Sequence, residues 1–180
     1  MPGVGLIDPT GATGTVKALL DGVDRRLGYL PDLMRVLAHS PAVLRGYLQF
    51  SGSLAGSGLG VQLREQIAIA VGATNGCTSC LAAHTQYARA AGLPDSEIDA
   101  ARDWSSADPT SAAALRFARL VLEAGGGHVR DAALANVRAA GFDDTAIVEI
   151  AAVVASNVFT NFINNLAHPA PDVDRQELSG

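Results

Sequence analysis

Apolar residues recur at steps of three and four along most of this chain, and that spacing is the strongest constraint on its fold. Val16, Leu19, Leu20, Val23 and Leu27 give the first example. This period places the apolar side chains on one face of a helix. Sustained period-two alternation and hairpin dipeptides between β-branched runs are both missing from the sequence. We therefore predict an all-α bundle of about eight helices without a sheet.

Capping residues and glycines mark where these helices begin and end. Ser40-Pro41 is typical of a helix start, and Asn75-Gly76 and Gly125-Gly126-Gly127 are typical of helix ends. A short apolar segment, 33–39, precedes Ser40. The predicted helices span residues 15–28, 41–54, 61–74, 77–91, 97–104, 111–124, 129–140 and 144–167.

The chain of 180 residues is long enough to bury one core, and its pattern predicts one domain. We expect an extended arm over residues 1–14, a helical domain over 15–168 and a tail over 169–180. The segment Arg89 to Ile98 is echoed 49 residues later by Arg138 to Ile147. This echo is consistent with a duplicated helical hairpin or with chance reuse of a helix stop and restart.

Charge and hydropathy exclude several classes of function. The net charge is −5 and the 13 Lys and Arg residues are scattered, so we expect no nucleic-acid partner. The most apolar region, 146–166, is interrupted by Glu149 and by several Ser and Asn residues, so we expect no membrane span. The N-terminus has no signal-peptide pattern, which leaves the cytoplasm as the expected compartment.

The only two cysteines, Cys77 and Cys80, lie three residues apart, a spacing suited to redox or metal chemistry in a reducing compartment. If Cys77 lies at a helix start, Cys77, Cys80 and His84 share one face. His84 then lies roughly 6 Å along the axis from Cys80 and roughly 10 Å from Cys77. We therefore expect His84 to act as the base for Cys80. The helix dipole favours the thiolate form of Cys80 over its thiol. Glu65, on the preceding helix, would orient His84 if that helix folds back.

Two other interpretations of the cysteines remain open. A zinc ion held by Cys77, Cys80, His84 and Glu65 would have an unusual ligand set, because no second Cys or His pair completes the motif. The two thiols could instead be buried structural residues. We expect no metal and no cofactor.

The last predicted helix carries a polar stripe of Asn157, Asn161, Asn164 or Asn165, and His168. We interpret the stripe as a solvated edge or a subunit contact, with a cavity lining as the alternative. The wide apolar arc of the same helix indicates a central or interfacial element, which favours oligomerisation. Tyr87 and Trp104 are interpreted as packing residues, with a place beside the pocket as the alternative for Tyr87.

The pattern Glu65-x11-Cys77-x2-Cys80-x3-His84, with Glu65-Gln66-Ile67-Ala68 and Asn75-Gly76-Cys77, resembles the alkylhydroperoxidase D proteins of the carboxymuconolactone decarboxylase family. The likeness is strong over about residues 60–100 and looser over 28–60 and 112–168. It implies an all-α homo-oligomer, often of trimers or hexamers, that reduces hydroperoxides. Cys80 would be the peroxidatic thiol, Cys77 the resolving thiol, and Glu65 and His84 the proton relay.

The resemblance also implies a dithiol reductant, for example a lipoyl-bearing partner. Ser79 stands where the best peroxidases of the family carry a histidine, which weakens the expected relay. The decarboxylase branch lacks the cysteine pair. The resulting expectation is a thiol-dependent hydroperoxide reductase. The alternatives are a redox sensor or disulfide-exchange adaptor without peroxide turnover, and a metal-binding or structural oligomer.

Overall fold

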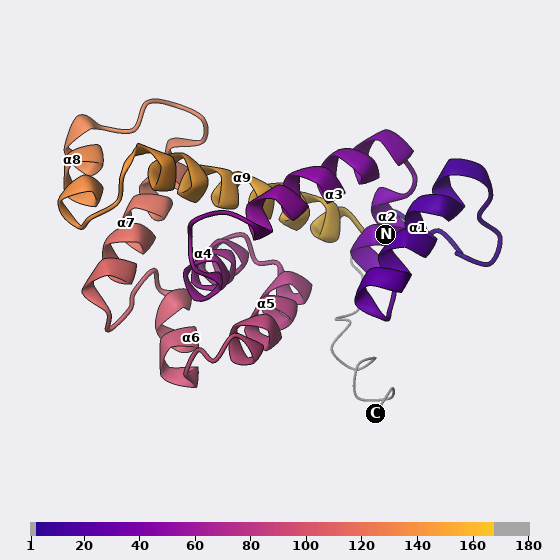
Figure 1. The fold of residues 1–180 in the computed structure, drawn as a ribbon, viewed down its shortest axis with the longest axis horizontal. Helices are drawn as coiled ribbons and strands as arrows, with labels where there is room; N and C mark the ends of the chain where they lie inside the picture. Colours follow the sequence, from indigo (N-terminus) through magenta and orange to yellow (C-terminus); the bar gives the residue numbers. More distant parts are fainter. Residues whose placement is uncertain (1–2, 168–180) are drawn as a thin grey trace.

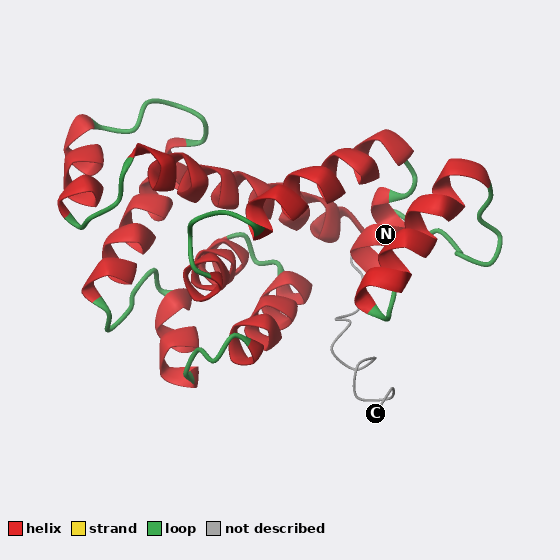
Figure 2. Cartoon of the chain, in the orientation of Figure 1, coloured by secondary structure: helices red, strands yellow, loops and turns green. Residues whose placement is uncertain are grey.

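The computed structural model describes residues 3–167, which form helices and loops and contain no strand, confirming the predicted all-α fold (Figure 2). Nine helices are present in this part of the chain, against the eight expected, because the apolar segment after Pro31 forms a helix of its own. The bounds are α1 Gly14–Leu27, α2 Asp32–Leu37, α3 Pro41–Ala55, α4 Val61–Thr74, α5 Thr78–Ala90, α6 Asp95–Arg102, α7 Pro109–Ala124, α8 Asp131–Ala139 and α9 Asp144–Ala167.

Helix α4 is the centre of the packing. It contacts α5, α6, α7 and α9, and every residue from Gln66 to Gly72 is buried. A helix that is covered on all sides needs apolar or small residues all round, which is why Ile67-Ala68-Ile69-Ala70-Val71 shows no polar face. The rigid surroundings of α4 fix the position of Glu65, which lies on its second turn.

Helix α9 runs along the long axis of the molecule, with α1 and α2 at one end and α7 and α8 at the other (Figure 1). It contacts α2, α3, α4, α5 and α7. Its length and composition would suffice to cross a membrane, but a core helix of a soluble protein meets the same test. Asn157, Asn161 and Asn164 are buried against other helices, which fits the core role.

Two groups of buried apolar residues meet along α9. The larger joins α4, α7, α8 and α9 around the fully buried Ile67, Leu115 and Ile150. The smaller joins α1, α2 and α3, and Phe159 and Ile163 of α9 pack against it. The N-terminal helices are therefore held against the same helix that packs on α4.

The repeated sequence at Arg89–Ile98 and Arg138–Ile147 forms two separate turns with the same local structure. Arg89 pairs with Asp95 and Arg138 pairs with Asp144, each at 2.8 Å. The glycine between the partners has a left-handed backbone in both turns, with φ 79° at Gly92 and 100° at Gly141. The same helix stop and restart thus links α5 to α6 and α8 to α9, while duplication of whole hairpins stays a prediction.

Candidate functional site

The candidate site begins at the turn between α4 and α5. Helix α4 ends at Thr74, and Gly76 takes a left-handed φ of 62°, so Asn75-Gly76 is the helix stop that the sequence predicts. The backbone N–H of Cys77 then donates to the carbonyl of Gly72 at 2.9 Å. This reversal lays α5 back along α4 and places Cys77 at the N-cap of α5.

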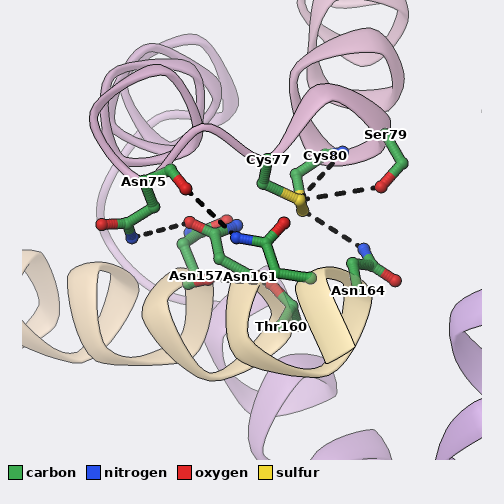
Figure 3. Close-up of a disulfide and its surroundings, with 9 residues drawn as sticks. Asn75, Cys77, Ser79, Cys80, Asn157, Thr160, Asn161 and Asn164 are labelled. Atoms are coloured by element: carbon green, nitrogen blue, oxygen red, sulfur yellow. Dashed lines mark hydrogen bonds between the residues drawn. A yellow bond between two sulfur atoms is a disulfide. The ribbon is translucent and has the colours of Figure 1, made fainter. Parts of the chain in front are cut away.

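Cys77 and Cys80 form a disulfide across the first turn of α5, with Cα atoms 5.3 Å apart (Figure 3). The backbone N–H of Cys80 points at the Cys77 sulfur at 3.4 Å, and the Ser79 hydroxyl lies 3.6 Å from that sulfur. Both cysteines are buried, at 1% and 4% exposure. After reduction, the N-terminus of α5 would favour a thiolate here, because the helix dipole and free N–H groups stabilise negative charge.

His84 and Glu65 meet across α5 and α4. The imidazole Nδ1 lies 2.7 Å from a carboxylate oxygen of Glu65, and both side chains are mostly buried. A carboxylate only accepts hydrogen bonds, so Nδ1–H donates, and in the neutral imidazole Nε2 then carries the lone pair. The fold-back expected for Glu65 is therefore present, and it directs Nε2 of the neutral imidazole away from Glu65.

A cavity of about 300 Å³ opens onto these groups. Cys80, Ser79, His84 and Glu65 line it, whereas Cys77 does not. A largely apolar part of the remaining wall comes from the N-terminal helices and the loops beside them, through Leu27, Leu33, Met34, Tyr47, Leu54 and others. Residues of α9, from Val153 to Asn164, line another part. A bound molecule would therefore meet the sulfur of Cys80 before that of Cys77.

Two tyrosines contribute a polar edge to the cavity. The hydroxyl of Tyr87 on α5 and that of Tyr29, between α1 and α2, lie 2.9 Å apart, and both residues line the cavity. Tyr87 also packs edge-on against the His84 ring, with centroids 5.8 Å apart. Desolvation, the Tyr29 hydroxyl and the charge of Glu65 raise the pKa of Tyr87. The alternative interpretation of Tyr87 as a pocket residue is therefore the one that the geometry supports.

The interpretation of the α9 stripe as a solvated edge or subunit contact is wrong for three of its residues. Asn157, Asn161 and Asn164 are buried and face the α4–α5 turn (Figure 3). Asn165 is exposed, and His168 lies outside the described residues. Three-residue and four-residue steps show that these amides share a face, but not what covers it. Here α5 and the turn before it cover them.

These amides contact the α4–α5 turn and the cysteine that follows it. Asn164 Nδ2 donates to the sulfur of Cys80 at 3.2 Å. Asn161 Oδ1 accepts from the Asn75 side chain at 2.9 Å, and Asn165 Nδ2 donates to the Asn75 carbonyl at 3.1 Å. Sequence reasoning found the stripe but missed its link to the cysteines, because Asn164 and Cys80 are 84 residues apart.

Residues 3–167 contain no group of three or more His, Cys, Asp and Glu side chains arranged to hold a metal ion. Both sulfurs are bonded to each other, and His84 Nδ1 is engaged by Glu65. In this oxidised form the two cysteines have no free thiolate, which is the form of cysteine that binds zinc.

Comparison with known proteins relates part of this chain to one family. The family model of the carboxymuconolactone decarboxylase family matches residues 41–124. No curated protein matches the chain. The fold closely matches an uncharacterized peroxidase-related protein with an alkylhydroperoxidase AhpD core from Ralstonia eutropha JMP134, with TM-score 0.80, 24% identity, and coverage of 92% of this chain and 90% of that one.

Two further solved structures have the same fold. An uncharacterized peroxidase-related protein from Silicibacter sp. TM1040 has TM-score 0.80 and 22% identity, covering 96% of this chain and 93% of that one. The debrominase Bmp8, solved in complex with 2,3,4-tribromopyrrole, has TM-score 0.75 and 18% identity, covering 93% and 90%. At these identities the matches show the fold, and this fold hosts more than one chemistry.

Proposed function

Through residues 41–124 this chain is a member of the carboxymuconolactone decarboxylase family, with an alkylhydroperoxidase D-like fold, and on that premise we propose that it is a thiol-dependent hydroperoxide reductase. One observation carries the proposal. A Cys77–Cys80 disulfide at a helix N-terminus adjoins a His84–Glu65 pair, and Cys80, His84 and Glu65 line one cavity.

The first step is attack of the reduced Cys80 on the hydroperoxide. His84 Nε2 takes the thiol proton, directly or through one water, and Glu65 stabilises the resulting imidazolium. The Cys80 thiolate attacks the terminal peroxide oxygen, an S–O bond forms and the O–O bond breaks. The leaving alkoxide receives the proton from His84. The products are Cys80 sulfenic acid and an alcohol, so sulfur is oxidised by two electrons and the peroxide is reduced by two.

The second step forms the disulfide that the structure contains. The Cys77 sulfur attacks the sulfenic sulfur, an S–S bond forms and the S–O bond breaks, and the departing hydroxyl takes the Cys77 thiol proton and leaves as water. The Ser79 hydroxyl lies beside the Cys77 sulfur and stands where related peroxidases carry a histidine. It offers a hydrogen bond to that sulfur but no titratable base near pH 7.

A dithiol must then reduce the disulfide back to two thiols, itself becoming a disulfide. Both sulfurs are buried, and the cavity reaches Cys80. A slender arm such as a lipoyl group fits this access, whereas the flat surface of a folded protein does not. The same burial argues against the sensor or adaptor alternative, which needs another protein's thiol to attack one of these sulfurs directly.

The apolar part of the cavity points to the kind of hydroperoxide. Leu27, Leu33, Met34 and Leu54 line part of the cavity wall. An organic group on the peroxide would bury apolar surface there, and hydrogen peroxide would not. We therefore propose an organic hydroperoxide as substrate.

The proposal extends to a homo-oligomer in the cytoplasm. On α9, the apolar side chains of Val148, Phe162 and Leu166 are 67%, 62% and 59% exposed. Three exposed apolar side chains on one helix favour an interface with another molecule over isolated surface residues. Burial of this face against a second copy would remove it from water. Light scattering of the purified chain measures the number of subunits, and a monomer would contradict this part.

Thiol titration around a single turnover tests the function. The reduced protein is mixed with one equivalent of cumene hydroperoxide, and free thiols and cumyl alcohol are counted. We expect loss of two thiols and formation of one alcohol per chain. Cys77→Ser should still make one alcohol and leave a Cys80 sulfenic acid that a dione probe traps, whereas Cys80→Ser should make none.

The two serine variants serve as controls for each other, because each removes one sulfur from the same buried turn. If cumene hydroperoxide leaves both thiols of the reduced protein free, the peroxidase proposal is wrong. If 2,3,4-tribromopyrrole oxidises them instead, the activity is closer to that of the structurally similar debrominase.

A further inference from the structure

The side chain of Asn164 on α9 contacts the sulfur of Cys80, and the mechanism above does not use it. Its Nδ2 lies 3.2 Å from the sulfur of Cys80, and both residues are buried, at 8% and 4% exposure (Figure 3). Asn164 also lines the cavity that reaches Cys80. The amide therefore lies beside the sulfur that would react with a peroxide.

The other end of the same amide has no partner. Asn164 Oδ1 is buried and accepts no hydrogen bond from any described residue. A buried amide oxygen without a donor is unfavourable, and such groups in proteins usually have a specific explanation. The oxidised state supplies one here. A disulfide sulfur carries no hydrogen and cannot donate, whereas a thiol S–H or a sulfenic S–O–H can.

The rest of the stripe holds α9 against the α4–α5 turn. Asn161 and Asn165 bind the side chain and the carbonyl of Asn75, two residues before Cys77. Asn157 is tied to its own helix through the Val153 carbonyl. The register of α9 is thus fixed on both sides of the sulfur contact, so the Asn164 amide is positioned before any reaction.

We propose that Asn164 is a catalytic residue that binds the Cys80 sulfur through its amide, donating Nδ2–H to the thiolate and accepting from the sulfenic hydroxyl through Oδ1. A hydrogen bond from a neutral donor to an anionic sulfur is stronger than one to a disulfide sulfur. The contact therefore favours the reactive form of Cys80. The acceptor end orients the sulfenic hydroxyl while Cys77 attacks. This role rests on the proposed function but is tested without it.

The thiolate population of Cys80 is the direct readout. In a Cys77→Ser background, the rate of alkylation by iodoacetamide is measured against pH, so that only Cys80 reports. Asn164→Leu keeps much of the side-chain shape and removes both the donor and the acceptor, and Asn164→Ala is the second variant. We expect alkylation near neutral pH to slow about tenfold and the profile to move to higher pH, because a hydrogen bond to a charged group is lost.

Asn161→Leu is the matched control. It removes a buried amide from the same helix face, one turn earlier, but Asn161 neither contacts a sulfur nor lines the cavity. We expect the control to leave the profile in place. The other charged and titratable groups around the cavity are unchanged in every variant: Arg64 and Glu65 on α4, His84 and Tyr87 on α5, and Tyr29 and Tyr47 from the N-terminal region.

Two outcomes would overturn the inference. One is an alkylation profile in folded Asn164→Leu or Asn164→Ala that coincides with the parent profile. The other is an equal shift in Asn161→Leu, which would indicate a general loosening of α9. Circular dichroism identifies which variants are folded, and Asn164→Ser replaces any that are not. No peroxide is used in this experiment. Failure of the peroxidase proposal would therefore be seen separately, in the thiol titration, as free thiols that remain after addition of cumene hydroperoxide.

Discussion

His84 Nδ1 lies 2.7 Å from a Glu65 carboxylate oxygen, and this contact joins α5 to the buried helix α4 next to the disulfide. A glutamine at position 65 could still accept from Nδ1 and hold the tautomer, but it could not balance an imidazolium. We expect Glu65→Gln to lower kcat/KM for cumene hydroperoxide about tenfold and His84→Gln about a hundredfold, since only the second removes the base.

Stopped-flow consumption of hydroperoxide measures both variants. Arg119→Gln is the control, because it breaks an exposed ion pair with Glu123 on α7, and neither residue lines the cavity. Equal losses in Glu65→Gln and His84→Gln would mean that the charge of Glu65 matters as much as the base.

Ala83 lines the cavity one turn after Cys80, so a larger side chain there reduces the room for an organic group. We expect Ala83→Leu to lower kcat/KM for cumene hydroperoxide about tenfold and to change hydrogen peroxide turnover little. Ala90→Leu makes the same substitution at an exposed position of α5 and should change neither. A parallel loss with both peroxides would place the binding site of the organic group elsewhere.

The raised pKa of Tyr87 predicts a loss of stability in alkali. The folded chain keeps the phenol proton where the unfolded chain has lost it, so this contribution is complete below the ordinary tyrosine pKa near 10 and falls as pH rises beyond it. We expect the free energy of unfolding in urea to fall less steeply above that pH in Tyr87→Phe. Equal slopes for both proteins would contradict the contribution of Tyr87.

Asp108 caps α7, and its carboxylate accepts from the backbone N–H of Ser111 at 2.7 Å. This hydrogen bond lowers the pKa of Asp108, so its stabilising effect is complete above the ordinary aspartate range and disappears as pH falls through the lowered value. We expect Asp108→Ala to lower Tm at neutral pH, with a difference from the parent that shrinks in acid. Asp108→Asn keeps an acceptor and should lower Tm less.

Local patterns were enough to predict the α4–α5 unit. Asn75-Gly76 stops one helix, Cys77 begins the next, and the spacing of Cys80 and His84 puts both on one face. These features depend on a few neighbouring residues, which is what helix-end signals encode.

Contacts between distant segments were beyond the reach of those patterns. Tyr29 and Tyr87 are 58 residues apart, and Asn164 and Cys80 are 84 apart. Periodicity placed the asparagines of α9 on one face, but polar residues on a face are usually solvated, and only the packing of α5 shows that these are not. The separate helix Asp32–Leu37 was likewise hidden in a segment too short for periodicity to decide.

The segment that carries the family match ends at residue 124, and α9 begins at Asp144. Cys77, Cys80, Glu65 and His84 lie inside that segment, while Asn164 and one wall of the cavity lie beyond it. A fragment cut after α7 would therefore keep every letter of the sequence signature and expose its disulfide to solvent. The family match and the complete candidate site therefore depend on different stretches of this sequence.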